Sequence, residues 1–295
     1  MQHCLFSISY AGLWGQDRLS LADFIRRAAD LGYTGVMIAG KRPHLSPLDA
    51  TPERLGEVQA ALAATGLSCP VIAGYTDFSG TGPPMVPVVE MQIAYVEALA
   101  RMAAALGARY VRVFTGYERD QEPLIHTWER VIASLQESCD RAAACGITLC
   151  LQNHHDVGVC SQTMAALLAE IDRPNCRLGF DAWSLALRGE DLYEAARRLA
   201  PMTAITTNAD YVRLPRARYL PRLENYEALT PDLVRAVPFG DGDIDYDAFF
   251  RGLRDGGFDG VATYEMCAPL RGGGRLANLD RAAGQYLAWM RQRGW

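Results

Sequence analysis

No stretch of about 18 apolar residues without a charge occurs in this sequence, so we expect no transmembrane helix. The first residues lack a basic segment and a small-residue cleavage site, which argues against a secretory signal. Eight cysteines are present but none forms a Cys-x-x-Cys pair, so a thiolate metal site is not expected and reduced thiols in a cytoplasmic protein are favoured. The formal net charge of −5 argues against a nucleic-acid partner.

The sequence does contain a repeated junction, in which a helix-like stretch ends in glycine and a short apolar run follows. The glycine is Gly32, Gly66, Gly107, Gly146 or Gly257, and a sixth junction, at Pro201, lacks it. Glycine just past a helix permits the left-handed backbone that closes the last turn. Continuous apolar runs are typical of buried parallel strands, so the pattern predicts βα units.

Eight strand candidates can be placed along the chain. They are Cys4–Ser9, Thr34–Ala39, Leu67–Ala73, Arg109–Phe114, Ile147–Gln152, Arg177–Asp181, Met202–Thr207 and Gly260–Glu265. The helical stretches between them include Met91–Leu106, Trp128–Cys145, Asp191–Leu199 and Tyr246–Leu253. No Gly-x-Gly-x-x-Gly follows the first strand, which counts against dinucleotide binding. Without any linker-like break, residues 1–295 are predicted to form a single (β/α)₈ barrel rather than an open doubly wound sheet.

Two segments look irregular and are predicted to be loops, Ser79–Pro87 and Ala209–Asp245. The second carries Arg213, Arg216 and Arg218 among prolines and tyrosines, with Arg222 close behind. A solvated surface is the favoured interpretation of these arginines. A lid or an oligomer contact is the functional alternative, because loops this long in a compact domain are often functional.

Polar side chains close the later strands. Gln152-Asn153-His154-His155-Asp156 follows the fifth, Asp181 ends the sixth, Thr207-Asn208-Ala209-Asp210 follows the seventh, and Glu265 ends the eighth. Buried polar groups are costly unless they are paired or used. In a barrel the strand ends converge on one mouth, so two carboxylates, an amide and two imidazoles are expected to share a cavity. Oxygen and imidazole donors suit a divalent ion such as Mn²⁺, Mg²⁺, Co²⁺ or Zn²⁺.

The last part of the chain carries a family resemblance. Residues Val237–Tyr246 include a Pro-x-Gly-x-Gly segment, and Gly257-Phe258-Asp259-Gly260 leads to Tyr264-Glu265. In these features the chain resembles the xylose-isomerase-like barrel superfamily, which includes sugar isomerases and epimerases, inosose and dehydroshikimate dehydratases, and endonuclease IV. In its sugar enzymes Glu, Asp, His and Glu at the ends of strands five to eight hold one metal, and the glutamates act as acid and base. The resemblance implies that Asp181 and Glu265 occupy ligand positions.

Two positions depart from the family pattern. Gln152 stands where the first Glu is expected, and an amide can neither carry charge nor act as a base. Thr207-Asn208-Ala209-Asp210 replaces His-x-Lys-Asp, and none of the five histidines lies near the seventh strand. We therefore expect weaker metal binding unless His154 or His155 compensates. The predicted metal ligands are Gln152, Asp181, Asn208 and Glu265.

The resemblance implies a metal-dependent isomerase or epimerase that acts on a small sugar or keto-sugar through an enediolate. Glu265, His154 and His155 are the expected acid–base groups. Two alternatives stay open: a lyase or dehydratase on a related keto-polyol, favoured by the missing first Glu, and an altered barrel that only binds sugar. The superfamily's nuclease branch is disfavoured by the few histidines and the acidic charge, and a homo-oligomer is one option for the assembly.

Four further residues are expected to contact the substrate: Tyr10, Trp183, Thr207 and Arg271. Each candidate also has a purely structural interpretation. Tyr10 and Trp183 would then serve in packing, and Arg271 would belong to a flexible glycine-rich loop. In the same way Asp181 would cap the following turn, Glu265 would form a buried ion pair, and the histidine pair and Gln152 would stabilise the strand end.

Overall fold

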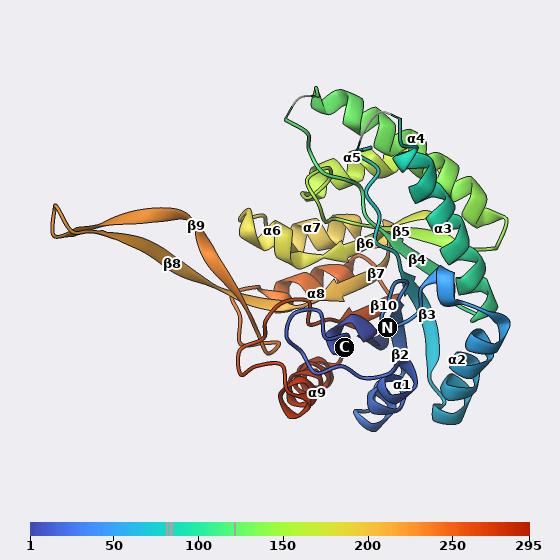
Figure 1. Ribbon diagram of the computed structural model, residues 1–295. Helices are drawn as coiled ribbons and strands as arrows, with labels where there is room; N and C mark the ends of the chain where they lie inside the picture. The colour runs from blue at the N-terminus through green and yellow to red at the C-terminus, as the bar shows by residue number, and fades with distance from the viewer. Residues whose placement is uncertain (81, 83–84, 121) are drawn as a thin grey trace.

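The computed structural model describes residues 1–80, 82, 85–120 and 122–295, and its centre is a closed barrel of parallel strands (Figure 1). The strands join in the order β1-β10-β7-β6-β5-β4-β3-β2. Their bounds are β1 Gln2–Phe6, β2 Gly35–Ala39, β3 Ser68–Ala73, β4 Tyr110–Val113, β5 Thr148–Gln152, β6 Cys176–Asp181, β7 Thr203–Asn208 and β10 Val261–Tyr264. The predicted (β/α)₈ barrel fold is therefore confirmed.

Helices connect the barrel strands and cover the outside of the barrel (Figure 1). They are α1 Leu21–Asp30, α2 Pro52–Thr65, α3 Val88–Ala105, α4 Leu124–Ala143, α5 Ser161–Ile171, α6 Ala182–Leu187, α7 Leu192–Leu199, α8 Tyr246–Asp255 and α9 Leu276–Gln292. The five junction glycines all have positive φ, between 69° and 86°. The repeated glycine thus marks where each helix turns into the next strand.

Alternate strand residues face the barrel interior or the helices, so the core has two layers. Phe6, Met37 and Cys150 belong to the inner cluster, whereas Phe180 and Tyr264 belong to the outer one. This alternation decides which side chains at the strand ends can meet inside the mouth. The same rule places Arg112, Gln152, Asp181, Thr207 and Glu265 on the inner side.

The first strand is shorter than predicted. It ends at Phe6, and Ser7–Tyr10 forms a 3₁₀ helix instead of continuing to Ser9. The Ser7 and Ser9 hydroxyls accept backbone N–H groups of Ala39 and Met266, both at 2.9 Å. These bonds, from the end of β2 and from the segment after β10, stabilise the 3₁₀ turn. The apolar pattern of the sequence does not predict this turn.

The prediction that Ala209–Asp245 is irregular is wrong for residues 210–237 and correct for residues 238–245, which belong to no helix or strand. Strands β8 (Asp210–Leu220) and β9 (Asn225–Val237) form an antiparallel ribbon that extends away from the barrel (Figure 1). Most of the ribbon is exposed, so neither strand has the apolar run that marks a strand buried in a core. Its prolines, at 215, 221 and 231, also weaken the strand pattern.

In the predicted loop Ser79–Pro87, positions 81, 83 and 84 lie outside the described residues, and the others belong to no helix or strand. Two short 3₁₀ turns complete the connections, Pro47–Asp49 and Ala200–Met202. Among the described residues, no helix combines the length and the apolar character that crossing a bilayer requires.

Candidate functional site

A cavity of about 230 Å³ opens at the carboxyl ends of the barrel strands. It contains a carboxylate, two cations, two imidazoles, an amide and a thiol between aromatic walls. The lining residues are Phe6, Ile8, Trp14, Lys41, Tyr75, Arg112, Phe114, Gln152, His154, His155, Glu265 and Cys267. They come from segments far apart in the sequence, and four of the predicted site residues, Gln152, His154, His155 and Glu265, are among them.

Glu265 lies just after β10, where its backbone N–H donates to the carbonyl of Asn208 at 3.0 Å. This bond continues the ladder between β10 and β7 and turns the carboxylate into the cavity. The Cys267 thiol lies 3.6 Å from Oε1 and is a weak donor. Burial raises the pKa of Glu265, and the positive charge of Arg112 opposes that rise. Glu265 is thus a buried carboxyl group that holds a proton more readily than an exposed glutamate does, and it faces the cavity.

Asp181 is held much more tightly at the end of β6. Its Oδ1 accepts the backbone N–H of Trp183 at 2.9 Å, so it caps α6, and Oδ2 accepts Gln152 Nε2 at 3.2 Å. The Asn153 amide accepts the Asp181 N–H at 2.8 Å and donates to its carbonyl at 2.7 Å. Burial, and then the nearby charge of Glu265, raise the pKa of Asp181 to about 7. Both carboxylate oxygens already have donors, so Asp181 is less available for proton transfer.

Arg112, on β4, is a site residue that the sequence analysis missed, and so are Lys41 and Cys267. It is only 1% exposed, and its Nε and Nη1 atoms have no hydrogen-bond partner among the described residues. Its guanidinium carbon lies 4.0 Å from the ring centre of Phe114 and 4.9 Å from that of Tyr75. Its charge lowers the pKa of both Asp181 and Glu265. The signal in the sequence was a lone charge inside an otherwise apolar strand.

Lys41 adds a second positive charge beside Arg112. Its Nζ lies 3.5 Å from the ring centre of Tyr75, so that ring contacts both cations. Partial burial, and then the charge of Arg112, lower the pKa of Lys41. A buried cation without an anionic partner is unfavourable, and two neighbouring cations repel each other. The pair is therefore arranged to receive an anionic group.

His154 and His155 form a defined pair above β5. The backbone N–H of His155 donates to His154 Nδ1 at 2.8 Å, so neutral His154 carries its proton on Nε2. Burial lowers the pKa of both rings to about 4, so both are neutral at pH 7. His155 has a φ of 66° and stacks on Tyr117 at 4.1 Å. Neutral His154 thus offers its Nε2–H as a hydrogen-bond donor to the cavity, and its role as a base stays a prediction.

The predicted metal ligands do not come together as a set. Asn208 faces outward, because its Nδ2 donates to the Thr263 carbonyl at 3.0 Å and lies 3.4 Å from the Tyr286 hydroxyl. Both oxygens of Asp181 are occupied by donors, and Gln152 turns its Nε2 toward that carboxylate. In the described part of the chain, no group of three His, Cys, Asp or Glu side chains is arranged to hold an ion. These donors do not fit a divalent metal.

Buried oxygens in this region that have no hydrogen-bond partner among the described atoms include Gln152 Oε1, Thr207 Oγ1 and the Tyr75 hydroxyl. Thr207 lies on β7 directly opposite Asp181 in the strand register. An unsatisfied buried acceptor is unfavourable. A ligand hydroxyl in the cavity would supply the donor that Gln152 Oε1 lacks.

The remaining predicted residues lie beside or outside the cavity. Trp183 stacks on Tyr211 at 4.4 Å, and the Tyr211 hydroxyl lies 3.4 Å from the Cys267 thiol, so Trp183 supports the cavity wall. The Tyr10 hydroxyl donates to Asp280 at 3.0 Å in the outer layer. Arg271 pairs with Asp241 at 2.5 Å on the surface. The structure therefore does not bring Tyr10 or Arg271 to the site.

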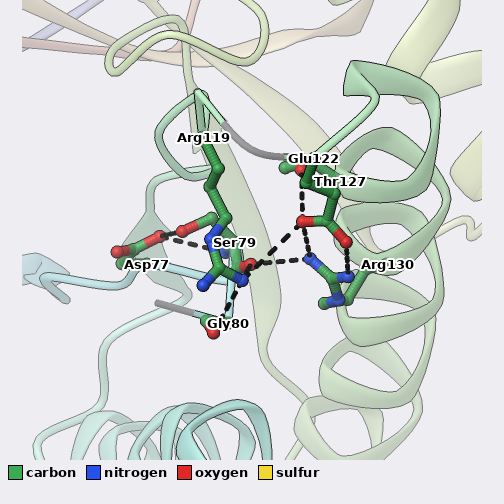
Figure 2. A network of polar contacts seen from close by, with 7 residues as sticks. All are labelled: Asp77, Ser79, Gly80, Arg119, Glu122, Thr127 and Arg130. Carbon is green, nitrogen blue, oxygen red and sulfur yellow. Dashed lines mark hydrogen bonds and ion pairs between the residues drawn. The ribbon is translucent and has the colours of Figure 1, made fainter. Parts of the chain in front are cut away.

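A polar network fixes the rim formed by the loops after β3 and β4 (Figure 2). Arg130 donates to the Ser79 carbonyl at 2.7 Å and pairs with Glu122, and Arg119 donates to the Gly80 carbonyl at 3.1 Å. A hollow of about 300 Å³ adjoins these arginines. Their guanidinium groups are already engaged by protein acceptors, so we place the functional site at the barrel mouth.

Comparison with known proteins agrees with this architecture. A family model described as xylose isomerase-like TIM barrel matches residues 25–293. A 3-dehydroshikimate dehydratase of Bacillus anthracis is 21% identical over 263 residues, which cover 86% of this chain and 88% of that protein.

Two solved structures share the fold. D-psicose 3-epimerase from Clostridium cellulolyticum H10 has a TM-score of 0.75 at 17% identity, with 99% of each chain covered. 3-keto-D-glucoside 4-epimerase from E. coli has a TM-score of 0.74 at 17% identity, again with 99% of each chain covered. At these identities the likeness shows a common fold.

Proposed function

Because this chain belongs to the family of xylose isomerase-like TIM barrels, we propose that its barrel mouth is an active site for proton removal next to a carbonyl group. The substrate is a small hydroxylated keto compound that carries a carboxylate or another anionic group. The reaction is elimination of water. One observation carries the proposal: the cavity holds an unpaired buried guanidinium, Arg112, together with an accessible carboxylate, Glu265.

The substrate class follows from the charges and walls of the cavity. Arg112 and Lys41 provide the positive charge that an anionic group needs, and a planar guanidinium suits a carboxylate in particular. The free Gln152 Oε1 can accept a hydrogen bond from a substrate hydroxyl. Phe6 and Phe114 present apolar surface to the carbon skeleton. The volume of about 230 Å³ is suited to a small molecule.

The chemistry uses one base and two electrostatic groups. Glu265 removes the proton on the carbon next to the carbonyl, and the electron pair moves toward the carbonyl oxygen. The Nε2–H of neutral His154 donates to that oxygen, and Arg112 stabilises the negative charge that develops. The electrons then return to form a C=C bond as the β-hydroxyl leaves. Glu265 transfers its proton to the departing oxygen, which completes one water molecule and regenerates the carboxylate.

Isomerisation is the second candidate, and the same carboxylate supports it. Glu265 can return its proton to the neighbouring carbon on the same face while the hydroxyl proton of the enediol passes to the former carbonyl oxygen, so a single base at carbon is sufficient. Epimerisation ranks lower, because inversion at carbon needs a second base on the opposite face. Asp181 has both oxygens bound by N–H donors. The curated relative is named a dehydratase, which supports elimination as the first candidate.

The proposal is tested by proton NMR in D₂O with anionic keto compounds and with a neutral ketose. Suitable compounds are 3-dehydroshikimate, keto-uronates such as fructuronate, and the neutral ketose fructose. Elimination gives a new vinylic proton signal, or new aromatic proton signals where loss of water completes an aromatic ring as it does in 3-dehydroshikimate, and isomerisation gives deuterium at a sugar carbon. We expect turnover of anionic compounds only, and none by Glu265→Gln. Equal turnover of fructose, or the binding of sugars without any exchange by the wild-type protein, would overturn the proposal.

A further inference from the structure

The β8–β9 ribbon is the largest feature that the proposed reaction does not use. It forms a sheet of its own with two strands, and only residues near its base, such as Tyr211 and Ala236, are buried. Figure 1 shows it extending well beyond the barrel. A two-stranded ribbon is marginally stable alone in water, and its edges leave backbone groups without partners. Such an arm is stabilised when a partner surface covers it.

The outer half of the ribbon has two different faces. Cross-strand partners share a face, and Ala217 pairs with Ala228 two positions from the pair Tyr219 and Tyr226. These four residues therefore make one apolar face. The two tyrosine rings lie 5.2 Å apart, and their side chains are 51% and 68% exposed. Leu223, in the turn, is 70% exposed.

The opposite face of the outer half is more polar, because two arginines, Glu227 and Asn225 lie there beside the half-buried Leu220 and Leu229. The pair of Arg218 and Glu227 alternates with the tyrosine pair, and Arg216 lies two residues before Arg218. An amphipathic ribbon of this kind is expected to place its apolar face against another surface. Exposed apolar patches of this kind mark interaction sites in soluble proteins.

The net charge of the ribbon indicates what kind of surface covers its apolar face. Residues 212–235 hold five arginines and three carboxylates, whereas the whole chain has 29 Lys and Arg against 34 Asp and Glu. The formal net charge of residues 212–235 is therefore +2, and that of the rest of the chain is −7. A second copy of this chain offers an acidic body that complements the basic arm. Reciprocal exchange of two arms also gives a closed twofold dimer, the commonest soluble assembly.

We propose that the β8–β9 ribbon is a dimerisation arm that lies, tyrosine face inward, on the acidic body of a second copy of this chain. The proposal does not depend on the reaction proposed for the barrel mouth. It is tested by the oligomeric state of the protein and not by its activity, so its failure can be distinguished from failure of the proposed reaction.

The test measures the oligomeric state of the full chain by sedimentation equilibrium over a range of protein concentrations. We expect a dimer for the wild type, and weaker association at high salt because exposed charges are screened. The double variant Tyr219→Ser/Tyr226→Ser should raise the dimer dissociation constant by about a hundredfold, as loss of two aromatic anchors does. Met91→Ser, which changes an exposed apolar residue on α3, is the matched control and should leave the dimer intact.

A shortened ribbon provides an independent variant. Arg213 and Val234 face each other across the strands, so Asn-Gly can join them in place of residues 214–233. The shortened protein should be folded and monomeric. A monomeric wild type at 100 µM, or an unchanged dimer in both the double variant and the shortened protein, would overturn the proposal. If the shortened protein does not fold, the double variant alone decides.

Discussion

At the scale of single residues, Arg112 links substrate choice to protein stability. A buried cation without a partner destabilises the free protein, and it is retained where a ligand uses the charge. The same guanidinium lowers the pKa of Asp181 and Glu265, so its effect reaches the base as well as the substrate. Binding, acidity and stability should therefore change together when Arg112 is replaced.

The variant Arg112→Gln tests this link. In the proposed complex Arg112 and the anionic group of the substrate form a buried charge pair. Removing one partner of such a pair commonly costs about 2–5 kcal/mol of binding free energy, so kcat/KM for an anionic substrate should fall by about two orders of magnitude or more. The acidic limb of the pH profile should move to higher pH, because the pKa of Glu265 loses its opposing charge. The unliganded variant should melt at a higher temperature than the wild type.

Arg112→Lys is the matched control, because it keeps the charge but loses the planar fork. It should retain the position of the acidic limb while binding the substrate less tightly. A pH profile that moves equally in both variants would contradict the electrostatic explanation.

Asp181 predicts a pH dependence of stability. Its pKa is about 7 in the folded protein and about 4 in the unfolded chain, so the folded state binds more protons between these values. The contribution of Asp181 to the free energy of unfolding is therefore greatest below pH 4 and is lost as pH rises toward 7. The lowered pKa values of His154 and His155 act in the opposite direction on acidification.

The variant Asp181→Asn isolates this contribution from that of the histidines. Urea denaturation measures the free energy of unfolding of both proteins. Relative to the wild type, the variant should become more stable as pH rises from 4 to 7, and the difference should then level off. Asp259→Asn, at an exposed position, should show no such trend. A flat difference curve for Asp181→Asn would mean that its carboxyl group is already ionised at pH 4.

The donor set at the barrel mouth also predicts metal independence. Activity should survive dialysis against EDTA, and the purified protein should lack stoichiometric Mn²⁺, Co²⁺ or Zn²⁺ by elemental analysis. The double variant Gln152→Glu/Thr207→His restores the residue types of the family pattern and should bind Mn²⁺ measurably by calorimetry. A wild-type protein that loses activity in EDTA and regains it with Mn²⁺ would contradict this prediction.

At the scale of elements, the junction between β7, the ribbon and α8 depends on Asp210. Its Oδ2 accepts the backbone N–H groups of Gly240 and Gly242 at 2.8 and 3.0 Å, and Oδ1 accepts that of Tyr211 at 2.9 Å. An added Cβ on Gly242 would lie 1.9 Å from Oδ1 of Asp210. The Gly-x-Gly segment is thus explained by close packing around one carboxylate.

Gly242→Ala should therefore lower the free energy of unfolding by about 2–4 kcal/mol, since the added methyl displaces the carboxylate and breaks its bonds. Urea denaturation measures this. Gly56→Ala, in the middle of α2, is the control, because its Cβ would meet no atom within 4 Å. That change should stabilise the protein by about 0.5–1 kcal/mol through helix propensity. Equal effects at both positions would contradict the packing argument.

At the scale of the whole molecule, our proposals assign separate tasks to the barrel and to the arm. Arg112, His154 and Glu265 all come from barrel strands or the turns directly after them. The arm reaches the site only through its base, where Tyr211 contacts Cys267 at 3.4 Å. The proposed reaction centre and the proposed interaction surface therefore lie in different parts of the structure.

This separation predicts that the shortened ribbon keeps the chemistry. With Tyr211 and Ala236 in place, the variant should retain kcat/KM within about threefold of the wild type, a free-energy change of about 0.6 kcal/mol. The assay is the same proton NMR experiment. Loss of turnover in a folded monomer would show that the arm, or the second copy, completes the site.

The sequence alone determined the barrel, because the junction glycines and apolar runs report local backbone conformation and burial along each strand. It also located Gln152, Asp181 and Glu265 at strand ends, since those positions follow from the same repeat. Only the tertiary structure decided that Asn208 and Tyr10 face away from the mouth, because a shift of one residue turns a side chain to the opposite face. Only the packing of distant segments shows that Nε and Nη1 of Arg112 have no hydrogen-bond partner among the described residues. Only that packing also shows that the outer part of the ribbon packs against no hydrophobic core.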